Sequence, residues 1–275
     1  MNRALHPTAP LLVAIRGAGS WKRVLRRCEF VIGLAAIGVL WHLVSLAVGN
    51  ATLVPPPLLV LKAWAGLWGE ELPTDIAASL VHLALGYGSG IAAGLVLALL
   101  AARFAVLEAI LDPLVEMLRP ISAIAWIPIA ILMFGISGGV PIFLIFYAAV
   151  FPIFINSLAG IKQVDTRLVQ AAEMLGASRR LIVTHVVMPA ALPLILAGAR
   201  LSLGVAWMAL VAAELTGADS GLGWRIFWYQ EFFAMDKVMA VILTIGLLGY
   251  VFDSLLRILQ ARITRWRPEH PEIGQ

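Results

Sequence analysis

Charged residues and cysteines are scarce in this chain of 275 residues. Asp, Glu, Lys and Arg make up 13% of it, whereas a soluble domain contains about 25%. The single cysteine, Cys28, excludes a disulfide within the chain and any cluster of cysteine metal ligands. Hydrophobic residues reach 61%, well above the level of about 45–50% in soluble domains, so composition alone predicts an integral membrane protein.

Lysine is also rare, and its rarity bears on nucleotide binding. A P-loop needs a lysine followed directly by Ser or Thr. The residues that follow Lys22, Lys62, Lys162 and Lys237 are Arg, Ala, Gln and Val, so none of the four lysines can complete that motif. No Ser–His–Asp set, carboxylate pair or metal-ligand spacing stands out, and we interpret His42 and His82 as structural. We therefore expect no catalytic residue, no metal and no cofactor, and any ATP would have to be bound by another polypeptide.

Six apolar stretches are long enough, or nearly so, to cross a bilayer as helices, which takes roughly 20 residues. They cover residues 30–48, 76–102, 121–136, 141–161, 190–213 and 238–256. The third is short and contains Pro128, which we expect to kink it. The sequence thus predicts an all-α polytopic protein with six transmembrane helices.

The distribution of Lys and Arg predicts the orientation of these spans. Sixteen of the 20 basic residues fall in segments 1–29, 103–120, 162–189 and 257–275, three fall in the intervening loops, and Arg200 falls within the fifth span. By the positive-inside rule, both ends of the chain are expected in the cytoplasm. We divide the chain into a flexible cytoplasmic tail (1–28), a transmembrane domain (29–260) and a cytoplasmic C-terminal tail (261–275). Residues 1–20 are too weakly apolar for a secretory signal.

Three features inside the spans are candidates for a role beyond crossing the membrane. Glycines recur every fourth residue at 86, 90 and 94, which predicts a face on which another helix packs closely. Arg200 is a cation at membrane depth, where it either lines a route for an anion or forms a structural pair. The residues we assign to a candidate pathway are Arg200, Trp126, Pro128 and Glu214.

The loop after the fourth span, residues 162–189, has the strongest pattern. Leu168, Ala171, Ala172 and Leu175 recur with helical spacing, and Gly176 follows where a helix would end. A second amphipathic piece follows at about 178–187, before Pro189. A helix–Gly–helix hairpin of small residues predicts a protrusion to which a partner protein can bind.

This loop resembles the signature loop of permeases of binding-protein-dependent ABC importers. Their pattern is E-A-A, three residues, G, nine residues and I-x-L-P. Here Gln170, Ala171, Ala172, Gly176 and Pro189 stand at the matching positions, with Gln replacing Glu and with Val186 and Met188 replacing Ile and Leu. The segments RPISAIAWIPIAILMFGIS (119–137), FPIFINSLAGIKQVD (151–165) and LGVAWMALVAAELTGADSGLG (203–223) resemble the nitrate, sulfonate and taurine branch of that superfamily, and the likeness extends over about 53–266.

The resemblance implies a fold, a location and a set of partners. It implies a type I ABC importer permease-like core in the bacterial plasma (inner) membrane, which carries a small anionic solute. The loop would act as a coupling helix that docks on a separate ATPase through Gln170, Ala171, Ala172, Glu173, Gly176, Ala177 and Pro189. The expected partners are two ATP-binding subunits, an external solute-binding protein, a second permease copy and membrane lipid, with no nucleic acid.

Three other functions remain open at this point. A secondary transporter driven by an ion gradient would need buried polar or acidic groups for its coupling ion. A membrane-embedded enzyme would need a nucleophile or metal set in the membrane, and a scaffold protein would need no pathway.

Overall fold

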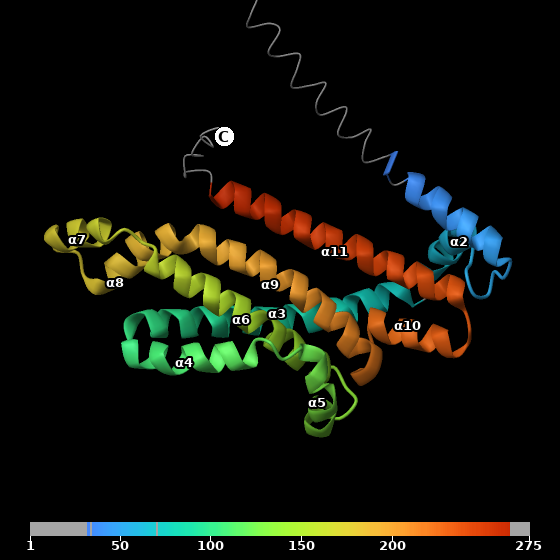
Figure 1. The fold of residues 1–275 in the computed structure, drawn as a ribbon, viewed down its shortest axis with the longest axis horizontal. Coiled ribbons are helices and arrows are strands. Elements are labelled where there is room, and N and C mark those ends of the chain that lie inside the picture. The colour runs from blue at the N-terminus through green and yellow to red at the C-terminus, as the bar shows by residue number, and fades with distance from the viewer. Residues whose placement is uncertain (1–31, 34, 70, 265–275) are drawn as a thin grey trace, which may run out of the picture. The chain divides into compact units, whose positions relative to one another are not determined.

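The structure is a computed structural model that describes residues 32–33, 35–69 and 71–264, and every regular element in these ranges is a helix (Figure 1). The chain divides into two compact units, residues 1–63 and 64–275, and each is described by itself. The predicted tail 1–28 lies outside the described residues, as does the predicted C-terminal tail beyond residue 264.

The first unit contains an apolar helix, Ala35–Val48, and a proline-rich turn. The Trp41 indole donates a hydrogen bond to the Pro55 carbonyl (3.2 Å), and the Ser45 hydroxyl donates one to the Val54 carbonyl (2.8 Å). The first predicted span, 30–48, lies partly outside the described residues. Its described part is shorter than the roughly 20 residues that a crossing requires, so this span stays a prediction.

The second unit is built on four helices that are long and apolar enough to cross a membrane. They are α3 (Leu72–Arg103), α6 (Gly139–Lys162), the continuous segment Arg179–Gly217 and α11 (Met235–Ile263). These correspond to the second, fourth, fifth and sixth predicted spans. Within Arg179–Gly217, α8 (Arg179–Ile182) leads through a π-helical stretch, Val183–Val187, into α9 (Met188–Gly217).

The third predicted span has a different form from the one expected. Helix α4 (Ala105–Leu118) is followed by a break at 119–122, a 3₁₀ turn at Ala123–Trp126 and the short helix α5 (Ile127–Phe134). The two halves are bent by 89° and could form one broken span, which would give up to five spans in the described residues. The full count of six and the orientation stay predictions.

Residues 103–120, predicted to be a cytoplasmic segment, mostly form α4, which runs back along α3 in Figure 1. The side of the membrane on which they lie stays a prediction. One expectation about this region was wrong. Pro128 was expected to kink a helix, but it stands in the first turn of α5, where a missing N–H costs nothing. The break lies instead at Pro120, which has no N–H to extend the hydrogen-bond ladder of α4.

Helix α6 forms the centre of the bundle, with α3 and α9 packed on it (Figure 1). The glycine stripe of α3 makes this packing possible. A Cβ placed on Gly90 would lie 2.8 Å from the Cβ of Ala149 on α6, and Gly86 and Gly94 meet α6 as closely. The predicted packing face is therefore confirmed.

We call the end of the bundle that carries α7 (Thr166–Met174) and α8 the hairpin end. Helix α4 begins at this end, because Glu108 in its first turn forms an ion pair with Lys162 at the end of α6. The short helix α10 (Leu222–Glu231) connects α9 to α11 at the opposite, far end (Figure 1).

Candidate functional site

The hairpin of α7 and α8 has the turn that its sequence predicts. Asp165 caps α7 by accepting a hydrogen bond from the Arg167 N–H (2.9 Å). At the other end, Gly176 has a φ of +78°, a left-handed conformation that glycine adopts without strain. The Ala177 N–H donates to the Ala172 carbonyl (3.0 Å), and the Gly176 N–H donates to the Glu173 carbonyl (2.9 Å). These paired bonds form a Schellman motif, so Gly176 ends the helix as expected.

The residues assigned to the coupling loop lie together on this hairpin, and most are exposed. Gln170, Ala171, Glu173 and Gly176 are exposed, whereas Ala172 and Ala177 are half-buried. Pro189 lies apart from them, in the first turn of α9. Its place at the start of α9 is suited to begin that helix, not to contact a partner at the hairpin tip.

Sequence reasoning missed two residues at the tip of the hairpin. Met174 and Leu175 are 89% and 88% exposed, which makes them the two most exposed large apolar side chains in the part of the chain described here. Both precede Gly176, and the tight turn holds them away from the bundle. Their position next to the helix-ending glycine could have identified them.

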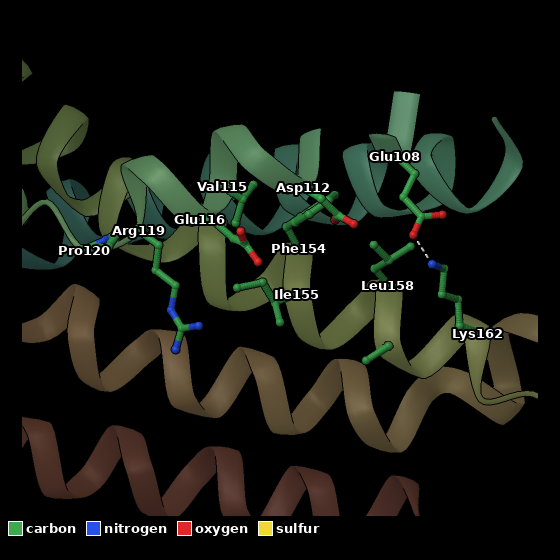
Figure 2. Close-up of a pocket in the computed structure, with 11 residues that line it drawn as sticks. Glu108, Asp112, Val115, Glu116, Arg119, Pro120, Phe154, Ile155, Leu158 and Lys162 are labelled. Carbon is green, nitrogen blue, oxygen red and sulfur yellow. Dashed lines mark hydrogen bonds and ion pairs between the residues drawn. The ribbon is translucent and has the colours of Figure 1, made fainter. Parts of the chain in front are cut away.

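Two hollows lie along α4, α6 and α9, and together we call them the groove. The first, the acidic hollow, has a volume of about 590 Å³ and is enclosed by α4 and α6. Figure 2 shows the carboxylates of Glu108, Asp112 and Glu116 along α4, with Glu108 paired to Lys162. The second, the apolar hollow, has a volume of about 430 Å³ and is lined by the 3₁₀ turn, α6 and α9, including Tyr147, Phe151 and Met208.

Arg119 is the one residue that lines both hollows. It follows the last residue of α4, at the start of the break. In Figure 2 its side chain extends away from α4 and from the neighbouring carboxylate of Glu116. Sequence analysis placed it in a cytoplasmic segment and gave it no further role.

Arg200, which sequence analysis assigned to the candidate pathway or to a structural pair, lies elsewhere. Its guanidinium donates two hydrogen bonds to Asp253 of α11, with Nε–Oδ1 at 2.7 Å and Nη2–Oδ2 at 3.2 Å. Arg257 also donates to Asp253 (2.7 Å). The pair lines a small hollow of about 160 Å³ between α9 and α11, which shares no residue with the groove. This geometry favours the structural alternative for Arg200.

Comparison with known proteins identifies the family. The profile described as binding-protein-dependent transport system inner membrane component matches residues 90–265. The chain belongs to this family. It is an ABC importer permease and a multi-pass membrane protein, and the resemblance noted in the sequence is confirmed.

Individual relatives cover most of the permease. The taurine transport system permease protein TauC of Escherichia coli is 34% identical over 90% of this chain and 94% of its own. SsuC of Bacillus subtilis, named for aliphatic sulfonates transport, is 37% identical over 85% of each chain. The nitrate import permease protein NrtB of Synechococcus elongatus is 28% identical over 82% of this chain and 86% of its own. A solved chain of the MetNI methionine ABC transporter, in an inward-facing conformation, shares the fold with a TM-score of 0.58 at 20% identity, over 70% of this chain and 94% of that one.

Glu214, another predicted pathway residue of the permease, is fully buried and lines none of the hollows described above. Its carboxylate accepts hydrogen bonds from the Ser79 hydroxyl (2.8 Å) and from the Gly223 N–H (3.0 Å), and it lies 2.8 Å from the His82 Nδ1. The Leu222 N–H in turn donates to the Ser79 hydroxyl (2.9 Å). These contacts join α3, α9 and the start of α10, so in this structure Glu214 connects helices.

A second buried contact holds α10 against α3. The Arg225 Nε donates to Asp75 (2.5 Å), and its Nη1 forms an ion pair with Glu71. Burial lowers the pKa of Arg225, but hydrogen bonding and the charges of Asp75 and Glu71 outweigh it and leave the pKa raised. Arg225 therefore stays charged. Helix α10 is thus held at the far end of the bundle by the contacts of Glu214 and by those of Arg225.

Neither of the last two predicted pathway residues lines the apolar hollow. The Trp126 ring packs 5.5 Å from the ring of Tyr147, which does line the hollow, and its Nε1 is buried with no partner among the described residues. Pro128 is exposed in the first turn of α5. The four predicted residues are thus not brought together. Within the described ranges, no group of three or more His, Cys, Asp or Glu side chains is placed to hold a metal ion.

Proposed function

We propose that this permease imports a small anionic solute and is driven by ATP hydrolysis on separate subunits that hold the α7–α8 hairpin. Two copies would form the pathway between them, with two ATP-binding subunits at the hairpin ends and a solute-binding protein at the far ends. ATP would be bound by the partner subunits, since the chain has no P-loop. The hairpin end would then face the cytoplasm.

The exposed tip of the hairpin carries the proposal. An exposed apolar pair on a small, rigid turn is typical of a surface that a partner covers, because fully buried apolar anchors supply most of the binding energy at interfaces. Met174 and Leu175 fit such anchors, and the alanines of α7 leave room for a partner to approach the backbone. The Schellman turn at Gly176 holds the pair in place before binding, which lowers the ordering cost of association.

The solute class rests on the names of the relatives. These name taurine, aliphatic sulfonates and nitrate, all of which carry an oxyanion group. The groove on α4, α6 and α9 supplies a candidate half of the pathway. A conformational change driven from the hairpin would be passed to α9, because α8, the π-helical stretch and α9 are continuous.

Uptake into proteoliposomes tests the proposed energy source. The complete transporter would be assembled from permease, ATPase and binding protein, and supplied with radiolabelled taurine, ethanesulfonate or nitrate. We expect uptake of at least one of these that needs ATP, stops with vanadate and is unaffected by ionophores. Uptake that follows an imposed ion gradient without ATP would favour the alternative, a secondary transporter, which membership of this family does not favour.

A double substitution tests the hairpin. Covering a Met or Leu side chain is worth about 2 kcal/mol, so Met174→Ala with Leu175→Ala should weaken ATPase binding by at least about tenfold. The matched control replaces the adjacent exposed apolar pair Ile258 and Leu259 of α11, 54% and 46% exposed, by alanine. The affinity of each variant for the ATPase subunit is measured by co-purification at graded concentrations. Equal affinities of the hairpin variant and the control would reject the hairpin as the docking site.

A further inference from the structure

The charge at the junction of the two hollows lies far along the bundle from the hairpin end. Helix α4 has 14 residues, so at 1.5 Å per residue Arg119 lies about 21 Å from its start at the hairpin end. The hydrocarbon core of a bilayer is about 30 Å thick. With the hairpin end at the cytoplasmic surface, as proposed, Arg119 lies at membrane depth, where a cation is costly unless it faces a polar cavity or a partner. Non-helical backbone at this depth, such as the break that follows Arg119, is likewise tolerated only inside protein or beside a water-filled cavity.

Arg119 differs from Arg200 and Arg225 in its partners. Arg200 is paired with Asp253, and Arg225 is paired with Asp75. Arg119 is exposed in the groove and makes no ion pair or side-chain hydrogen bond within the described residues. Its five N–H donors are therefore available to a solute, and their planar arrangement matches two oxygens of an oxyanion.

The surroundings of Arg119 favour a negative group on one side only. In the acidic hollow, Asp112 and Glu116 have no cationic partner among the described residues and would repel an anion. The apolar hollow on the other side is lined by Tyr147, Phe151 and Met208, with no carboxylate among its residues. An oxyanion head at Arg119 would leave an organic body against this apolar and aromatic lining, as in a small organic sulfonate.

We propose that Arg119 binds the oxyanion group of the solute during passage, at the point where the two hollows meet. This inference rests on the proposed function, since it assumes that the permease carries an anionic solute. It assigns to Arg119 the role that the sequence suggested for Arg200. Loss of a bidentate, charge-assisted contact should slow transport about 10- to 100-fold.

The test measures uptake and ATP hydrolysis in the same proteoliposomes. Arg119→Gln and Arg119→Lys are compared with the wild type in the complete transporter, using radiolabelled taurine, ethanesulfonate and nitrate. The control is Arg262→Gln, which removes an exposed cation at the hairpin end of α11. We expect Arg119→Gln to lose uptake by about 10- to 100-fold, Arg119→Lys to lose less, and Arg262→Gln to match the wild type. ATP hydrolysis stimulated by the binding protein should stay unchanged in all three.

Each other outcome has a defined meaning. If the wild type takes up none of the three probes with ATP, the proposed function fails. If the wild type takes up a probe and Arg119→Gln takes it up equally fast, the role of Arg119 fails while the proposed function stands. If Arg119→Gln loses uptake and ATP hydrolysis in proportion, Arg119 acts on folding or coupling, and the proposal is also overturned.

Discussion

The buried carboxylate of Glu214 offers a quantitative test of how the far end is held together. Glu214→Ala removes the acceptor for two hydrogen-bond donors, the Ser79 hydroxyl and the Gly223 N–H, and the partner of the His82 ring. Each buried group left without a partner costs about 1–3 kcal/mol. With three such groups and the cavity left by the side chain, we expect the variant to lose about 5 kcal/mol of unfolding free energy.

The isosteric substitution Glu214→Gln separates hydrogen bonding from charge. The amide oxygen can still accept from the Ser79 and Gly223 donors, and the amide NH₂ can donate to the His82 ring in the tautomer whose Nδ1 accepts. The loss is then mainly the added strength of bonds to a charged group, about 1–2 kcal/mol. Both values can be measured from SDS-driven unfolding of the purified permease in mixed micelles. The control is Thr216→Ala, half a turn further along α9, whose exposed hydroxyl bonds only to the carbonyl of its own helix.

Two results would refute this reasoning. Equal stabilities of Glu214→Ala and Glu214→Gln would mean that hydrogen bonding to the carboxylate does not hold α10. Unchanged stability with abolished uptake in Glu214→Gln would instead support the pathway role that the sequence suggested. We expect Glu214→Ala to be less stable than Glu214→Gln, and uptake to fall with stability in both variants. That result would assign Glu214 to holding the helices of the far end together.

Three further substitutions test the packing, the structural ion pair and the hairpin turn. Gly90→Leu should destabilise the bundle by about 3 kcal/mol, because even its Cβ would overlap α6, whereas Gly88→Leu, which faces open space, should leave the unfolding midpoint unchanged. Arg200→Gln should lower the melting temperature slightly and leave the uptake rate unchanged, since Asp253 still pairs with Arg257. A large loss of uptake by a variant of normal abundance would instead support a role of Arg200 in the pathway. Gly176→Ala forces a left-handed φ on a residue with a Cβ, so it should cost about 1 kcal/mol and weaken ATPase binding about fivefold; unchanged affinity would show that the turn is not needed in its present form.

The features that sequence analysis predicted well depend on short stretches of the chain. Long apolar runs predicted α3, α6, α9 and α11, because a bilayer requires length and hydrophobicity within one segment. The hairpin was equally local, since a helical period followed by Gly176 specifies a helix and its end within a dozen residues. The glycine stripe of α3 predicted close packing but did not identify α6 as the partner.

The features that it missed depend on residues far apart in the chain. Glu214 meets His82 across 132 positions, and Arg200 meets Asp253 across 53. No local pattern pairs such residues, so the sequence predicted Glu214 as a pathway residue and His82 as a structural histidine, without linking the two. Only the packing of α3, α6 and α9 brings the first pair together, and it turns a candidate pathway residue into a buried link.

Sequence analysis did not predict the helix α4 for a different reason, and that reason bears on function. Glu108, Asp112 and Glu116 recur every fourth residue, which places them along one side of a helix whose other positions are mostly apolar. These charges interrupt the apolar positions of residues 103–120, so the segment lacks the unbroken apolar run of a span, yet a helix that lines a water-filled groove needs a polar side at membrane depth. The break at Pro120 then ends α4 where the two hollows meet, and irregular backbone and an unpaired cation at membrane depth are tolerated only beside a cavity. The acidic residues that kept α4 from being predicted as a span are therefore the ones that give it a polar side toward the groove. Arg119, which directly follows α4, is the residue at which that groove can bind a negative solute.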